Sequence, residues 1–168
     1  MGEFTFETID IGTGRLQFNL KGYLDERAKL PESSHFANAS ELVFNFSDCQ
    51  MINSMGIKKW VVLMNKIKDL GPIKVILSHC PIMVINQVNL IKSFLPKKGE
   101  VESIYFPIIC SNCDQDFSVL GKVKDVAAES NRLLSDLKEL ECDQFPKCKK
   151  HLELDFSPEF VFGFLKNR

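Results

Sequence analysis

Four of the six cysteines are spaced in a way that suits metal binding. Cys110 and Cys113 form a CxxC unit, and Cys142 and Cys148 form a second, looser pair. Two pairs of thiolates can supply the four sulfur or nitrogen ligands of a tetrahedral structural zinc site. His151, which follows shortly after Cys148, is an alternative ligand. The sequence therefore predicts a structural zinc ion held by these side chains.

The cysteine-rich segment resembles a zinc ribbon in which one knuckle is irregular. Residues 145–148 read Phe-Pro-Lys-Cys, with phenylalanine in place of the first cysteine of a Cys-Pro-x-Cys knuckle. Two other interpretations stay open: a ribbon that has lost its metal, and a redox-active thiol pair formed by Cys110 and Cys113. A catalytic zinc has less support, because no Glu or His clusters with the cysteines in the sequence.

A serine at the start of a helix is the second feature that could carry chemistry. The apolar strand 42–46 leads through a polar stretch to Asn53 and Ser54, where an amphipathic segment begins. Free N–H groups and the positive end of the helix dipole favour negative charge there, so a phosphate on Ser54 would be well accommodated. The simpler alternative is that Asn53 or Ser54 only caps the helix.

The segment Asn53-Ser54-Met55-Gly56 resembles the Asp-Ser-Ser-Gly signature of STAS domains, the modules of bacterial anti-sigma factor antagonists and sulphate transporter tails. Upstream, Gly22-Tyr23-Leu24-Asp25 resembles the Gly-x-Leu-Asp turn that closes the second strand of that family. The resemblance covers about residues 1–105. It implies a regulatory, non-catalytic domain that docks an anti-sigma factor or serine kinase through Asn53, Ser54, Met55 and Gly56. It also implies that phosphorylation of Ser54 breaks this complex.

Hydrophobic periodicity predicts the elements that position the serine. The order of strand, helix and strand implies parallel strands joined by a right-handed crossover. We therefore expect an α/β fold, a mixed sheet with helices packed mainly on one face. The expected elements are a hairpin over 3–20 with its turn at 12–14, a short helix or two helical turns within 26–39, a central strand at 42–46, a helix at 55–70, a strand at 73–78, a helix at about 82–94 and a strand at 102–109.

The chain is expected to divide into a STAS-like domain, 1–105, and a small cysteine-rich β/α extension, 106–168. In the extension, apolar spacing predicts a helix over 123–140 that links the cysteine pairs, and 151–155 alternates like a strand. The phenylalanine-rich segment 158–165 must bury its side chains, either in the chain's own core or in a partner's groove.

Composition argues against several function classes. The 168 residues carry a net charge of −1 and no basic run longer than 147–150, so nucleic acid is not an expected partner. The most apolar window, 73–91, contains Lys74 and Pro81, and no membrane span is expected. Six cysteines without a secretory signal region favour a cytoplasmic location. Cys49 and Cys80 are expected to pack as small apolar groups.

Three hypotheses for function follow. The first is a non-catalytic regulatory module that docks a protein partner, with Ser54 as the candidate phosphoacceptor. The second is an enzyme, either a thiol oxidoreductase using Cys110 and Cys113 or a zinc hydrolase. The third is a structural module in which zinc stabilises self-association. The sequence favours the first and favours no particular oligomeric state.

Overall fold

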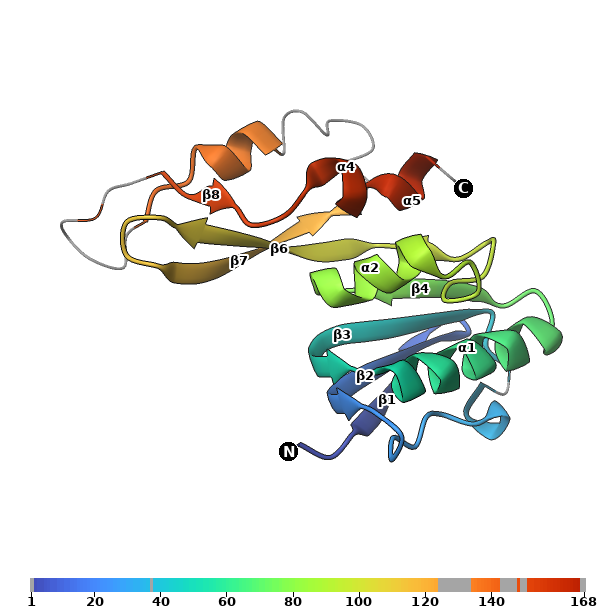
Figure 1. The fold of residues 1–168 in the computed structure, drawn as a ribbon. Helices are drawn as coiled ribbons and strands as arrows, with labels where there is room; N and C mark the ends of the chain where they lie inside the picture. The colour runs from blue at the N-terminus through green and yellow to red at the C-terminus, as the bar shows by residue number, and fades with distance from the viewer. Residues whose placement is uncertain (1, 37, 124–133, 143–147, 149–150, 167–168) are drawn as a thin grey trace.

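The computed structural model describes residues 2–36, 38–123, 134–142, 148 and 151–166, and its larger sheet has five strands in the order β1-β2-β3-β4-β5. β1 runs antiparallel to β2, and the other neighbouring strands are parallel. The protein is therefore a mixed α/β protein, as predicted (Figure 1). The strands are β1 (Thr5–Gly12), β2 (Arg15–Leu24), β3 (Glu41–Ile52), β4 (Lys74–Ser78) and β5 (Glu100–Val101).

The predicted N-terminal hairpin is confirmed. Its turn residues Gly12, Thr13 and Gly14 have φ values of 87°, 54° and 73°, a left-handed geometry that glycine adopts easily. Among the described residues of the stretch 26–39, the helical part is a short 3-10 helix, η1 (Ser33–Phe36). β3 lies centrally, as predicted, and is longer than the expected strand 42–46. Its added length carries the chain directly to Asn53.

Two helices, α1 (Ser54–Asp69) and α2 (Ile82–Leu90), cover one face of this sheet (Figure 1). Trp60 on α1 is fully buried, with its ring centroid 5.0 Å from that of Phe44 and 5.2 Å from that of Phe46. Each aromatic pair of this kind adds roughly 0.5–1.5 kcal/mol beyond area burial. The buried face of α1 also includes Leu63, Met64 and Ile67, as its periodicity predicts.

α2 is shorter than the predicted helix at 82–94. It closes at Leu90, because Ile91 has extended backbone angles, φ −120° and ψ 105°. Phe94 and Leu95 enter the core from the following loop instead. The indole N–H of Trp60 donates to the Phe94 carbonyl at 2.8 Å, which satisfies a buried donor that would otherwise be costly. The predicted C-terminal end of α2 was wrong, because the hydrogen bond between Trp60 and Phe94 cannot be inferred from the local spacing of apolar residues.

A second sheet forms an arm that extends beyond the first (Figure 1). Its strands are β6 (Ser103–Cys110), β7 (Gln115–Lys122) and β8 (Glu153–Leu154), in the order β7-β6-β8. β6 pairs antiparallel with both neighbours. The sequence predicted β6 and a strand near β8 but not β7. β6 also crosses the expected boundary between residues 105 and 106, so the two regions share one continuous strand.

The C-terminal segment returns to the main body of the molecule. Helices α4 (Pro158–Val161) and α5 (Gly163–Lys166) lie beside α2 (Figure 1). Val161, Phe162 and Phe164 are buried in the same core as Trp60, which confirms that this segment packs within the chain. Of the predicted helix 123–140, residues 134–138 are helical and 124–133 lie outside the described residues. None of the described helices combines the length and apolar character needed to cross a bilayer.

Candidate functional site

The start of α1 is built by an asparagine cap. Asn53 has extended backbone angles, φ −99° and ψ 175°, and its side-chain oxygen accepts a hydrogen bond from the Gly56 N–H at 2.8 Å. This satisfies one of the free donors at the helix start. Ser54, the first helical residue, is exposed, and its hydroxyl makes no hydrogen bond within the described part of the chain. Asn53 therefore performs the capping and leaves the Ser54 hydroxyl available.

The loop after β2 holds charged groups beside this cap. The Asn53 amide donates to a Glu26 carboxylate oxygen at 3.0 Å. The pKa of Glu26 is lowered, first by its own backbone N–H and second by Asn53. Next to it, hydrogen bonds from the side chain and then the backbone N–H of Arg27 lower the pKa of Asp25. Two carboxylates are thus kept ionised next to the helix start, and sequence reasoning had assigned neither a role.

Gly56 lets the first turn of α1 approach the end of β2. A Cβ at this position would lie 1.8 Å from the Leu24 carbonyl oxygen, well inside any allowed contact. The Asn53 N–H also donates to the Leu24 carbonyl, at 3.2 Å. Position 56 therefore needs glycine, because the backbone of α1 lies directly against the backbone of β2 here.

Large apolar side chains are exposed beside the start of α1 and along its first turns. Met51, Met55 and Val62 have exposed fractions of 41%, 45% and 47%. Met51 borders a hollow of about 630 Å³ that reaches Asn53, and Met55 and Val62 border a groove of about 350 Å³ along α1. We call the surface formed by Met51, residues 53–56 and Val62 the docking face. Exposed methionines suit recognition, because their flexible side chains adapt to a partner.

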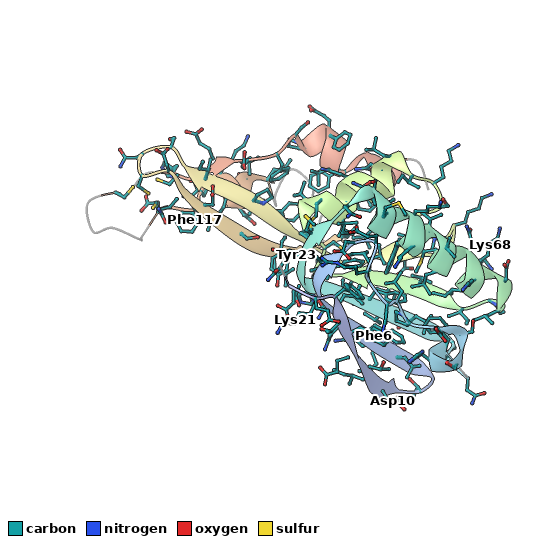
Figure 2. All side chains as sticks on the ribbon, turned by 60° about the horizontal axis from the view of Figure 1, so that its bottom comes forward. Phe6, Asp10, Lys21, Tyr23, Lys68 and Phe117 are labelled. Atoms are coloured by element: carbon teal, nitrogen blue, oxygen red, sulfur yellow. The ribbon has the colours of Figure 1, made fainter. Side chains whose placement is uncertain are left out.

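The four predicted cysteines come together near the tip of the arm, where Figure 2 shows sulfur atoms close to the labelled Phe117. The sulfur atoms of Cys110 and Cys148 are 3.4 Å apart, and those of Cys113 and Cys142 are 3.7 Å apart. All four lie within 4.8 Å of one another, and none is in a disulfide. Four sulfurs bound at about 2.3 Å to one tetrahedral zinc ion lie roughly 3.8 Å apart, so the spacing fits a metal site.

Backbone turns hold the first pair in place. The N–H groups of Cys113 and Asp114 donate to the Cys110 carbonyl at 3.3 and 2.8 Å, and Asp114 has a positive φ of 52°. Asn112, which sequence reasoning missed, donates its side-chain amide to the Cys148 sulfur at 3.3 Å. Burial acts to raise the pKa of Cys110, but hydrogen bonds from the Asn112 backbone N–H and from Cys148 outweigh it and lower the pKa to about 7. These contacts stabilise the thiolate that a metal requires.

His151, the alternative ligand, is exposed and pairs through its backbone with Glu141. Among the described residues, the ligand atoms that converge here are the four cysteine sulfurs. The irregular knuckle residues 143–147 lie outside the described residues.

The two remaining cysteines are buried in the core, at 5% exposure for Cys49 and none for Cys80. Burial raises the pKa of Cys49 to about 11 and that of Cys80 well above its ordinary value. Both stay neutral at physiological pH and pack as small apolar groups, as predicted.

No family model matches the chain, and no curated protein or solved structure is similar enough to count as a match. The fold and the cysteine cluster therefore define the class of protein: a mixed α/β protein with a small cysteine-rich region that can hold a metal ion.

Proposed function

We propose that the protein is a non-catalytic regulatory module that docks a protein partner through its docking face. The observation that carries the proposal is the exposure of Met51 and Met55 beside the capped start of α1, with Val62 further along the groove that Met55 borders. Exposed apolar groups next to concave surface are typical of interaction sites. The likeness of residues 53–56 to the STAS signature supports the same face and suggests an anti-sigma factor or serine kinase as the class of partner.

Phosphorylation of Ser54 is the proposed switch. The modification would add about two negative charges at the centre of the face. Glu26 is already ionised beside Asn53, so these charges would be repelled by it while the helix start attracts them. At an interface they would also require desolvation and would weaken the complex.

Site-specific photo-crosslinking tests where the partner binds. A crosslinking amino acid placed at Met55 is expected to capture one protein in cells that make the full chain. The matched control carries the same amino acid at Asp10 on β1, which is exposed and remote from the docking face. Equal capture from both positions would contradict the proposal.

We propose that the four cysteines hold a structural zinc ion that fixes the arm. Cys110, Cys113, Cys142 and Cys148 would be its ligands, and bound zinc would contribute folding free energy by joining β6 and β7 to the segments that carry Cys142 and Cys148. Metal analysis of the purified chain should find about one zinc per chain. Cys110→Ser should reduce this content, whereas Cys49→Ala should not. A chain without metal whose Cys110 and Cys113 react rapidly with thiol reagents would favour the oxidoreductase instead.

A further inference from the structure

A further concave surface lies at the end of α1 remote from Ser54. Its volume is about 790 Å³, within the range of small-molecule sites. Met64 and Ile67 of α1, Pro72 and Ile73 of the turn into β4, and Pro96 of the loop after α2 supply an apolar lining. The pocket residues on α1 begin at Met64, ten residues after Ser54, which corresponds to a rise of about 15 Å along the helix. Ser54 and the pocket thus lie toward opposite ends of α1.

Four exposed lysines border the same pocket: Lys68, Lys92, Lys97 and Lys98. Within the described part of the chain, none of them has a carboxylate in ion-pair range. Glu100, the acidic residue among those lining the pocket, is paired with Lys74 at 2.9 Å. Because the whole chain has a net charge of −1, this positive charge is a local excess. Figure 2 shows Lys68 at the end of α1 away from Tyr23.

The loop that carries three of these lysines is anchored in the core. Phe94 and Leu95 are buried, and the Phe94 carbonyl accepts the Trp60 indole N–H. The Gly99 N–H donates to the Pro96 carbonyl at 2.7 Å. A loop fixed in this way loses little freedom on binding, which favours affinity. The helix dipole can account for a lysine at the end of α1, such as Lys68, but not for lysines on the loop.

We propose that this pocket binds a soluble phosphate monoester with an apolar body. The lysines would neutralise the phosphate, for which an ammonium group is a common ligand. The apolar lining would bury the rest of the molecule. Inorganic phosphate lacks the apolar body and a neutral alcohol lacks the charge, so each alone should bind weakly. The proposal does not rest on the docking face or on zinc.

Calorimetric titration of the full chain with octyl phosphate tests the proposal, with inorganic phosphate and octanol as separate titrants. Trp60, the single tryptophan, reports on the loop through its bond to Phe94. We expect octyl phosphate to bind more tightly than either control and to change Trp60 fluorescence. The variant Lys92→Gln/Lys97→Gln/Lys98→Gln should weaken this binding by about tenfold or more, because three charge contacts are lost together.

A matched variant, Lys21→Gln/Lys29→Gln/Lys122→Gln, removes the same charge from exposed positions that do not line the pocket. It should keep the wild-type affinity. Equal loss in both variants, equal binding of inorganic phosphate or of octanol, or no binding of octyl phosphate would each overturn the proposal. So would a protein that sediments with phosphatidic acid vesicles but fails to bind the soluble ester.

Discussion

Asn53 uses both atoms of its side-chain amide, the oxygen to cap α1 through Gly56 and the nitrogen to bind Glu26. An aspartate at this position could accept from the Gly56 N–H but would place a second carboxylate against Glu26. The nearby Glu26 carboxylate therefore favours asparagine over aspartate at position 53. Sequence reasoning placed the cap at Asn53 or Ser54, and only the contact with Gly56 decides between them.

Asn53→Ala should lower the free energy of unfolding by about 1 kcal/mol, because the helix loses its cap. Urea unfolding followed by Trp60 fluorescence measures this change. Ser54→Ala is the matched control and should change stability by less than about 0.5 kcal/mol, since the hydroxyl is exposed and has no partner among the described residues. A larger loss from Ser54→Ala than from Asn53→Ala would contradict the assignment of the cap.

Asp25 makes the stability of this region depend on pH. Hydrogen bonds from Arg27 lower the pKa of Asp25 in the folded state, so the ionised form stabilises the fold. This contribution is present above the unfolded-state pKa of about 3.9 and is lost as the pH falls through the lower, folded-state pKa. Wild type should therefore exceed Asp25→Asn in stability at pH 6, and the difference should shrink below about pH 4. A difference that grows on acidification would contradict this account.

At the scale of elements, the docking face depends on how α1 meets β2. The first turn of α1 rests on the Leu24 backbone through Gly56, while the stripe from Trp60 to Ile67 is buried in the core.

Periodicity predicted the helix and its buried side, because both follow from the spacing of apolar residues. It could not predict the end of α2 or the presence of β7. β7 has a largely exposed face, and its hairpin with β6 turns at Asp114, a residue with a positive φ, where no glycine marks the turn in the sequence.

Gly56→Ala should destabilise the protein by about 1–3 kcal/mol, because the new methyl group must displace the Leu24 backbone. Thermal and urea unfolding both measure the loss. Lys58→Ala, an exposed change two residues further along the helix, should have an effect within about 0.5 kcal/mol. A stability equal to wild type in Gly56→Ala would show that α1 does not approach β2 this closely.

At the scale of the whole molecule, the chain's two ends share one core. Phe162 packs against Phe106 with ring centroids 5.8 Å apart, and both belong to the cluster that contains Trp60. The expected division at residue 105 was based on the extent of the STAS resemblance and the position of the cysteines. The division stays a prediction, and the sequence itself gives no sign of the long-range packing between Phe106 and Phe162. The four cysteines could be found from the sequence, because a CxxC unit such as Cys110 and Cys113 is typical of structural metal sites and a second cysteine pair follows it.

Phe162→Ala should lower the free energy of unfolding by about 3 kcal/mol, as expected for a large aromatic removed from a core. Trp60 lies in the N-terminal half, and the unfolding transition that its fluorescence reports should show the same loss of stability. Phe160→Ala is the control, because Phe160 is 45% exposed and its loss should have little effect. An unchanged Trp60 transition in Phe162→Ala would mean that the two regions unfold separately.

The affinity of the captured partner for three forms of the chain tests the proposed docking function most directly. Wild type and Ser54→Ala should bind equally, because the hydroxyl has no hydrogen-bond partner among the described residues and its removal leaves the charge of the face unchanged. Ser54→Glu should bind at least about tenfold more weakly, since a charge is placed at the centre of the docking face. Equal binding by all three forms would contradict both the location of the docking face and the switch at Ser54.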